Sequence, residues 1–465
     1  MKKTILTTVT ALLLSSMSFA QFRATDQTGI NVFETPKVET HFDGLKTTFG
    51  ASISMPYIDL KESNNPDILG KNSAGYNSYL ANGNPKNTQT LWQGSNNFGL
   101  SMANLYINTA LADGIALQVT LYLASKHHNE TWVKGGYVTM DKIPFIQSKL
   151  VDDIMKYTTI KVGQFDVNYG DAHFRRSDGG NGIYNVFMEN YIMDEFATEI
   201  GAEADVNYKG LVAVASVTDG ELNPDLTYID TTTAKYKYSN GLHNPSWIAK
   251  LGYDKQLGDK FRVRLTGSVY YTAGAIANTL FGGDRTGSNY NVVMYNAAPG
   301  TGTAFNGRYN PGLTNKLTTG MVNLFLKYKP VDWLAIESFS TYEKAKGSTP
   351  AEAKQRNANQ TATDLIFRFG KKENLFLGAR YNTVSADVAA SAASAPVAGQ
   401  IVQAALPAYT IGINRLAISA GWFITKNLLT KVEYVNQEYT GVPDVNYIFN
   451  QAKFHGVTAE AVISF

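Results

Sequence analysis

Residues 170–199 carry the side chains of this chain best suited to bind a charged small molecule. Arg175 and Arg176 are adjacent, and each guanidinium can hydrogen-bond a carboxylate or a phosphate through a planar fork. Acidic residues outnumber these two arginines, so the sign of the local field stays open, and internal pairing of the arginines is the alternative to ligand binding. The acidic residues are Asp171, Asp178, Glu189, Asp194, Glu195 and Glu199.

The remaining residues of types that do chemistry form no recognisable site. His127-His128 lack the further histidine or acidic ligands that a metal site needs, and no phosphate-binding GxxxxGK[ST] motif is present. The absence of cysteine excludes disulfides, thiolate zinc sites and cysteine nucleophiles. The six histidines give no preferred Ser-His-acid trio. We therefore expect no catalytic residues, no cofactor and no metal.

The first 20 residues have the pattern of an export signal. Lys2 and Lys3 give a basic start, residues 5–14 are apolar, and Ser18-Phe19-Ala20 places small residues where a signal peptidase reads them. Loss of these two lysines from a total of 41 Lys and Arg balances the 39 Asp and Glu. A neutral chain with 17% charged and 44% hydrophobic residues is expected neither to be disordered nor to bind nucleic acid.

Apolar and polar residues alternate with a period of two along much of the chain, which predicts strands with one apolar face. From Phe261 to Tyr271, for example, the odd-numbered positions are mainly apolar and the even-numbered positions are polar, with Arg262 and Arg264 among them. Sixteen strands are predicted, over residues 45–58, 98–111, 116–126, 137–145, 158–169, 200–208, 211–217, 247–257, 261–271, 317–329, 333–342, 364–370, 375–381, 415–422, 429–439 and 454–465.

Long and short connections alternate between the predicted strands. An even strand number with short turns at one end and long loops at the other is typical of outer-membrane β-barrels, whereas a water-soluble sandwich gives no reason for it. The sequence therefore predicts an all-β fold, a transmembrane antiparallel β-barrel of about 16 strands (16–18), with short periplasmic turns and long extracellular loops. The predicted units are a cleaved signal peptide at 1–20, a short periplasmic segment at 21–44, and one barrel at 45–465.

A barrel of this size leaves room for an aqueous channel, so we expect passive diffusion of small hydrophilic solutes and ions. The third long loop, 170–199, is expected to fold into the lumen and to form the constriction through Arg175, Arg176, Asp171, Asp178, Glu189 and Asp194. A small surplus of basic wall residues favours weak anion preference, and mutual pairing of the wall charges is the alternative. The wall residues are Lys250, Arg262, Arg264, Lys327, Arg368, Arg380 and Lys431 against Asp254, Glu337, Asp364, Glu433 and Glu460. A barrel enzyme and a structural or adhesin barrel with an occluded lumen are the rival functions.

One local motif carries a family resemblance. Lys161-Val162-Gly163-Gln164-Phe165, Asn168-Tyr169-Gly170-Asp171 and Arg175-Arg176-Ser177-Asp178, with the export signal and the terminal Phe465, resemble the porins of Gram-negative outer membranes, and among them the phosphate-selective porin O and P group and its Bacteroidetes-type relatives. The resemblance implies a homotrimer in outer-membrane lipid and recognition of the last strand by the barrel assembly machinery. Phosphate preference is not carried over, because the loop lacks the clustered lysines of that group.

Overall fold

The structure of the chain is a computed structural model that describes residues 22–37, 42–65, 94–99, 102–124, 131–177, 181–222, 227–230, 233, 235–238, 243–282, 293–294, 307–392, 405–445 and 447–465. Several features predicted from the sequence lie outside these residues. They are the signal peptide, His127-His128, Asp178 and most of the Ala-rich stretch after residue 392. No helix among the described residues is long and apolar enough to cross a membrane.

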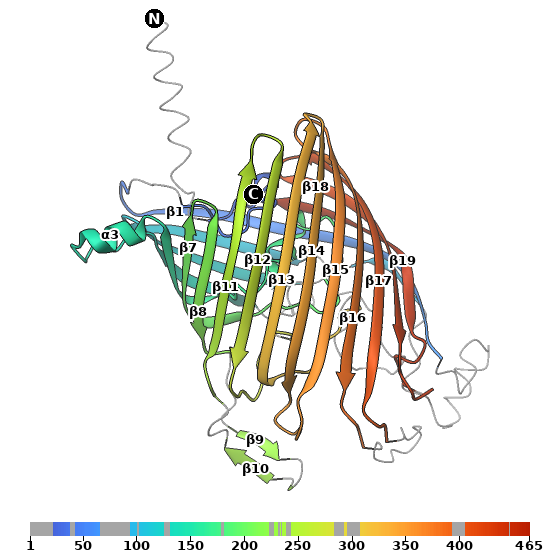
Figure 1. Ribbon diagram of the computed structural model, residues 1–465. Helices are drawn as coiled ribbons and strands as arrows, with labels where there is room; N and C mark the ends of the chain where they lie inside the picture. The colour runs from blue at the N-terminus through green and yellow to red at the C-terminus, as the bar shows by residue number, and fades with distance from the viewer. Residues whose placement is uncertain are drawn as a thin grey trace, which may run out of the picture.

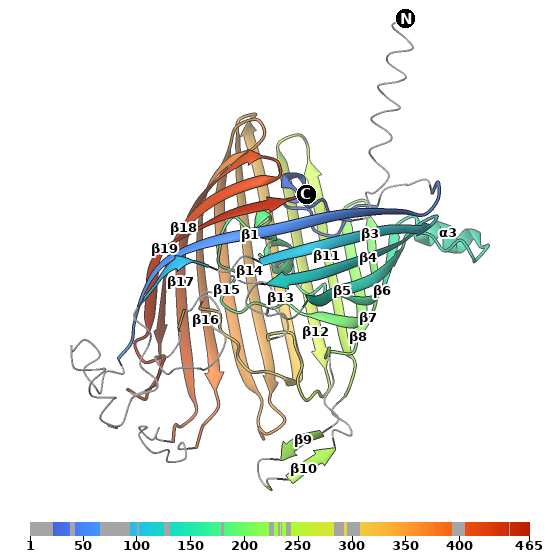
Figure 2. The ribbon, with the colours of Figure 1, turned by 180° about the vertical axis from the view of Figure 1, so that it is seen from behind.

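The chain forms a closed antiparallel β-barrel in which strands that follow one another along the chain pair around the wall (Figures 1 and 2). The barrel closes where β1 pairs with β19, from Ser52 opposite Ser464 to Ser63 opposite Lys453. Because β2 and β3 pair in succession with the same strand, β1, they form one interrupted strand, and the described residues give a 16-stranded wall. Closure pairs the backbone groups that lipid could not satisfy.

Each of the predicted strands has a counterpart in the structure. The wall consists of β1 (Lys46–Ser63), β2 (Gly94–Phe98), β3 (Met102–Ala112), β4 (Ile115–Ala124), β5 (Thr131–Met140), β6 (Thr158–Asp166), β7 (Thr198–Tyr208), β8 (Leu211–Thr218), β11 (Ser246–Leu257), β12 (Phe261–Thr272), β13 (Asn315–Val331), β14 (Leu334–Ser348), β15 (Arg356–Phe369), β16 (Leu375–Val388), β17 (Tyr409–Thr425), β18 (Leu428–Thr440) and β19 (Lys453–Ser464). A separate hairpin is formed by β9 (Thr227–Asp230) and β10 (Lys235–Tyr238).

Strand β5, predicted to begin at residue 137, begins earlier, at Thr131. Its register against β4 shifts between Gly135, opposite Thr120, and Val133, opposite Leu121, and this irregularity interrupts the alternation on which the prediction relied. The connection that follows contains the short helix α3 (Lys149–Met155), which projects from the side of the barrel in Figure 1. The described residues include the short 3-10 helices η1 (Gln27–Gly29), η3 (Ala172–Arg175) and η4 (Asn181–Ile183).

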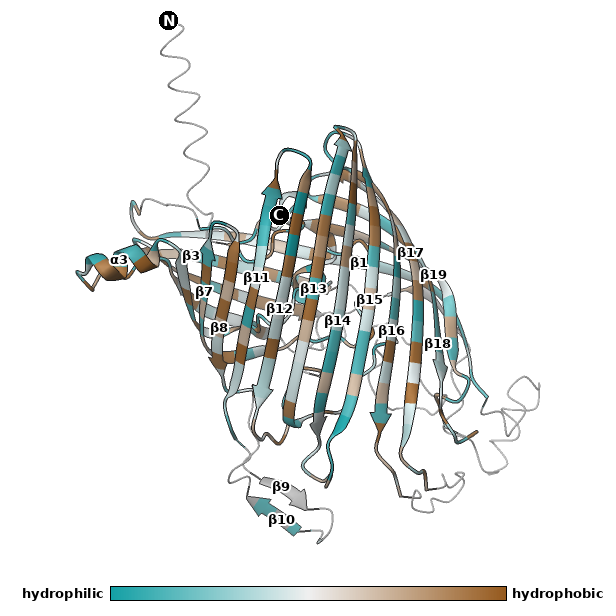
Figure 3. Ribbon diagram, in the orientation of Figure 1, coloured by the Kyte–Doolittle hydropathy of each residue, from teal (hydrophilic) through white to brown (hydrophobic). Residues whose placement is uncertain are grey.

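The outer face of the barrel is apolar, as lipid contact requires. Leu251, Leu265 and Val322 are about half exposed or more, at 62%, 50% and 50%, and they alternate with buried polar residues on the same strands. Figure 3 shows the wall strands banded with hydrophobic and hydrophilic residues. Aromatic residues are exposed on the outer face at Tyr253, Tyr271, Tyr328, Trp333, Tyr381 and Trp422. Tyr169 is different, with only 1% of its surface exposed. It lies inside the barrel, where its hydroxyl hydrogen-bonds Thr319 and Glu343.

Candidate functional site

The third long loop, residues 167–197 between β6 and β7, fills much of the barrel interior, as the sequence predicts. Asp171, Phe187 and Ile192 are fully buried, and the neighbouring residues of the loop are nearly so. The wall contributes apolar partners as well as polar ones. Ile366, Ala417 and Leu429 pack against Phe187, for example, in a cluster of buried hydrophobic residues. The loop is therefore a packed part of the core, and the polar groups of its backbone must find partners on the wall.

Wall side chains supply those partners. Lys431 Nζ donates hydrogen bonds to the carbonyl oxygens of Gly182, Asn185 and Phe187 at 2.9, 2.9 and 3.0 Å, and it forms an ion pair with Glu460 at 2.9 Å. Further bonds run from Arg380 to the Glu189 carbonyl, from Arg415 to the Asn190 carbonyl, from Ser419 to the Val186 carbonyl, from the Met188 amide to Glu433, from the Met193 amide to Gln360 and from the Ile192 amide to Asn382. The loop is thus clamped along β15–β19.

A second group of charges holds the start of the loop. The Asp171 carboxylate accepts hydrogen bonds from Arg264 at 2.8 Å and from Lys250 at 3.0 Å, and Thr266 donates to it at 2.7 Å. Glu34, from the N-terminal segment, pairs with the same Lys250 and Arg264 at 3.2 and 2.7 Å. Burial raises the pKa of both carboxyls, but the adjacent cations outweigh it and hold the pKa of Asp171 and of Glu34 below the usual range. Both groups are therefore ionised at neutral pH.

The other wall charges predicted from the sequence also face the lumen, and most of them form ion pairs there. This is the alternative that the sequence left open, because paired charges fix the wall and the loop and contribute little net field. Arg262 pairs with Asp254, Lys327 and Arg368 pair with Glu337, and Arg380 pairs with Asp364, at distances from 2.7 to 3.2 Å. Glu433 accepts the Met188 amide.

The two arginines of the predicted constriction have different surroundings. Arg175 is buried, donates to Asn31 and lies over the ring of Phe339 at 5.0 Å, away from the cavity described below. Arg176 faces that cavity and donates to Asp194 at 2.7 Å. The structure therefore does not bring both arginines to one opening, and Arg176 follows the predicted alternative of internal pairing.

Glu189 and Asp194 are buried as well, at 2% and 5% exposure. Burial raises the pKa of the Glu189 carboxyl to about 8, and the nearby Arg415 only partly offsets this effect. Glu189 is therefore expected to be largely protonated at neutral pH. Neither it nor Asp171 faces the cavity, so the constriction residues predicted from the sequence act mainly as packing and anchoring groups.

The N-terminal segment was expected in the periplasm, but the structure places its described residues, 22–37, across the inside of the barrel at the short-turn end. We call these residues the N-terminal strap. Phe33 is 3% exposed and packs edge-on against Phe174 and Phe325, with ring centroids 5.7 and 5.5 Å apart. Asn31 donates to Glu337 at 2.8 Å. Burial of Phe33 and the ion pairs of Glu34 explain why the strap stays inside instead of in water.

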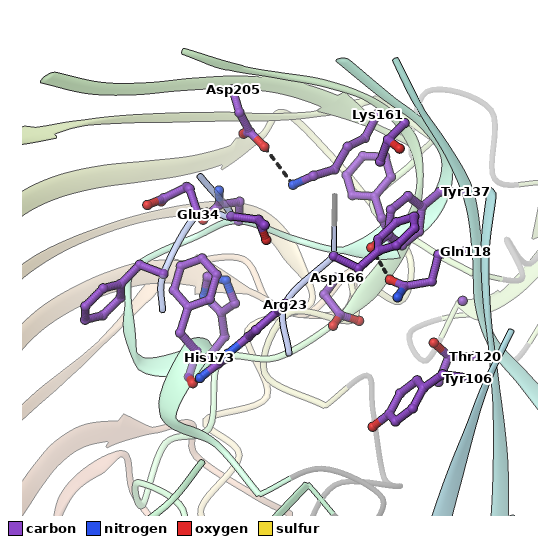
Figure 4. A pocket seen from close by; sticks show the side chains of 18 of the residues that line it. Arg23, Glu34, Tyr106, Gln118, Thr120, Tyr137, Lys161, Asp166, His173 and Asp205 are labelled. Atoms are coloured by element: carbon purple, nitrogen blue, oxygen red, sulfur yellow. Dashed lines mark hydrogen bonds and ion pairs between the residues drawn. The ribbon is translucent and has the colours of Figure 1, made fainter. Parts of the chain in front are cut away.

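A cavity of about 210 Å³ remains between the strap, the third loop and the wall strands β3–β7 (Figure 4). Polar wall side chains point into it, among them Tyr106, Gln118 and Thr120. Tyr137 donates to Gln118 on the same side, and Lys161 pairs with Asp205 at 2.7 Å. Among the lumen-facing residues of β3 and β4, Gln118 and Thr120 are partly exposed, whereas most lumen-facing residues of β13–β18 are buried against the loop.

Sequence reasoning missed these cavity residues. Their signal was present in the polar positions of the predicted strands 98–111 and 116–126, where Asn104, Gln118 and Thr120 alternate with apolar residues. They were overlooked because they are uncharged, and the search followed charges. His173 also lines the cavity, and burial together with the charge of Lys250 lowers its pKa to about 3, so its ring stays neutral there.

No family model and no curated protein matches the chain. Solved structures of bacterial outer-membrane proteins resemble it only remotely. An anion-selective porin from Comamonas acidovorans has a TM-score of 0.49 and 9% identity, covering 91% of this chain and 100% of that one. The outer-membrane channel DcaP of Acinetobacter baumannii has a TM-score of 0.45 and 12% identity, covering 91% of this chain and 98% of that one. Outer-membrane expressed OmpT of Vibrio cholerae has a TM-score of 0.46 and 11% identity, covering 92% of this chain and 100% of that one. The function is therefore inferred from the geometry of the lumen.

Proposed function

We propose that the protein is an outer-membrane porin, and not an enzyme, through which small hydrophilic solutes and ions diffuse passively. The observation that carries the proposal is the asymmetry of the lumen. On the side of β13–β18 the third loop seals the wall, while on the side of β3–β7 polar side chains border a cavity. A barrel built only for support would gain nothing from leaving Gln118 and Thr120 partly exposed inside it.

The size of the cavity limits the solutes. Its volume of about 210 Å³ lies below the roughly 300–1,000 Å³ of clefts that hold drug-sized ligands, so ions and small solutes are the expected cargo. Its charged lining is nearly balanced. Basic groups come from Arg23, Lys37, Lys134, Lys161 and Arg176, and acidic groups come from Glu34, Asp141, Asp166 and Asp205. On this proposal any preference for anions, phosphate included, is weak.

The extent to which the loop is packed favours a second candidate, a structural or adhesin barrel with an occluded lumen. The two candidates differ in one property, the passage of ions. Membership of the porin O and P group, export by the N-terminal signal and assembly as a homotrimer stay part of the porin proposal, and the motif at 161–178 and the apolar outer face support it.

Single-channel recording of the refolded protein in planar bilayers tests the proposal, and the absence of native cysteine allows a sharp control. Thr120→Cys places a thiol in the cavity, and Thr341→Cys places one at a lumenal position that is only 2% exposed. We expect stable current steps, reduced by a charged methanethiosulfonate reagent in Thr120→Cys and unchanged in Thr341→Cys. Folded, inserted protein without steps would overturn the proposal in favour of the occluded barrel.

A further inference from the structure

The N-terminal strap spans the short-turn mouth of the barrel from one side to the other. At one end, Asp26 forms an ion pair with Lys426 at 3.0 Å, and the Gln27 amide donates to the Lys426 carbonyl at 2.8 Å. Lys426 lies in the turn between β17 and β18. Gln27 Nε2 also donates to the carbonyl of Lys372, in the turn between β15 and β16, at 2.9 Å. This end of the strap is therefore tied to two short turns.

The other end of the strap is tied across the barrel, at the connection between β5 and β6. Lys37 Nζ donates to the carbonyl oxygens of Asp141 and Thr158 at 2.7 and 2.5 Å, and also to that of Met155. Three carbonyl acceptors around one ammonium form a specific latch, because each of them is directed at the same donor.

The wall and the third loop hold further residues of the strap. Arg262 donates to the Asn31 carbonyl at 3.1 Å, and Asn31 in turn donates to Glu337. Arg23 donates to the carbonyl of Phe174 in the loop at 2.8 Å. The strap is thus a fixed partition, joined to both of the other structures that border the lumen.

Open space lies on both sides of this partition. On one side is the cavity of about 210 Å³, which the strap lines through Phe22, Arg23 and Thr25 and from Phe33 to Lys37. On the other is a recess of about 800 Å³ bordered by Gln27, Ile30 and Asn31 of the strap and by Lys327 of the wall. Lys37 and Asp141 border the first cavity and also a groove of about 760 Å³ beside α3 at the short-turn end. The latch therefore stands between the cavity and that end of the barrel.

We propose that the strap is the size filter of the pore: it closes one half of the periplasmic mouth and confines permeating solutes to the passage beside Lys37. The inference rests on the proposed porin function and adds its specificity-determining element. Lys37 sets the width of the passage through its latch to the β5–β6 connection. The third loop, by contrast, seals the far wall and does not itself border the exit.

Deletion of residues 22–37 from the full chain tests the filter, with single-channel conductance and the exclusion limit for neutral polyethylene glycols as readouts. We expect a several-fold higher conductance and admission of larger polymers, because the cavity and the opposite recess would join. Native steps with an unchanged conductance and polymer limit in the deletion would overturn the filter and leave the porin function standing. Steps seen only in the deletion would overturn the filter as well as the porin function, because the strap would then be a complete plug.

A point substitution keeps the test valid if the deletion does not fold. Lys37→Met removes the latch but leaves the ties of Asp26 and Gln27 at the other end. We expect a raised polymer limit in this variant. The matched control is Lys260→Met, in the turn between β11 and β12, where Lys260 is exposed and donates to the Pro330 carbonyl. Folded Lys37→Met with the polymer limit of native protein would contradict the proposal.

Discussion

Replacing Lys431 by Met should release residues 181–188 of the third loop from the barrel wall. The ammonium group is buried and makes three hydrogen bonds to loop carbonyls and an ion pair with Glu460. Its removal leaves the Glu460 carboxylate without its cation, and breaking a buried pair in this way costs about 3–5 kcal/mol. At about 1.4 kcal/mol for each factor of ten, local opening should become roughly two to three and a half decades more frequent.

Hydrogen exchange of amides, measured by mass spectrometry on the peptide that contains residues 181–190, reports this opening directly. The double variant Lys431→Met/Glu460→Gln is the control, because it removes the unpaired charge and leaves only the lost carbonyl bonds. We expect its exchange to fall between the native rate and that of the single variant. Exchange in the single variant within about threefold of the native rate would refute the idea that Lys431 clamps the loop.

The remaining predictions concern the loop and its charges. In Arg176→Ala, the reversal potential measured in a salt gradient should shift toward the value of a more cation-selective pore. Arg175→Ala should leave it unchanged, because Arg176 borders the cavity and Arg175 does not. Equal shifts in the two variants would contradict this assignment. Glu189 keeps its proton up to a pKa of about 8 when folded, so its contribution to stability should fall as pH rises from about 4.5 to about 8, and Glu189→Gln should remove that slope from melting temperatures measured at pH 5, 7 and 9. Gly170→Ala should destabilise the loop in hydrogen exchange, because Gly170 has φ +66° and an added Cβ would lie 2.2 Å from the sulfur of Met321.

The strands could be predicted because every second residue of a membrane barrel faces lipid. Where that holds, as in β12, the predicted and observed bounds agree within one residue. The predicted strands are shorter than the observed ones where the strands extend beyond the apolar outer surface of the barrel. Strand β15 begins at Arg356, and strand β16 ends at Val388. Thr361 and Thr363 on the outer face of β15 are polar, so hydropathy no longer alternates in that part of the strand. Strand length beyond the lipid depends on pairing, which alternation does not report.

The site was less predictable, because its residues are defined by partners far away in the chain. The sequence placed Lys250 and Arg264 on the lumenal face, and in the structure both are buried and paired with Asp171. Their joint partner Glu34, however, lies more than 200 residues away in a segment expected in the periplasm. No local pattern links these positions, because the contact arises only when the closed barrel brings the strap beside the wall. Arg175 and Arg176 also differ because of contacts that are distant in the sequence. Although the two residues are adjacent, Arg175 contacts Asn31 of the strap and Arg176 contacts Asp194 of the loop.

The pairing of the wall charges changes how selectivity should be read from the sequence of such a barrel. The loop at 170–199 has an excess of acidic residues and the wall has a surplus of basic ones, and the structure uses this complementarity to hold the loop. A charge that is neutralised by a buried partner contributes little to the field along the pore. The number of charged residues that a sequence places on the lumenal face therefore indicates how firmly a loop is attached to the wall. Selectivity depends instead on the few groups that border the remaining passage, and the latch at Lys37 is where a change of charge should act most directly on permeating ions.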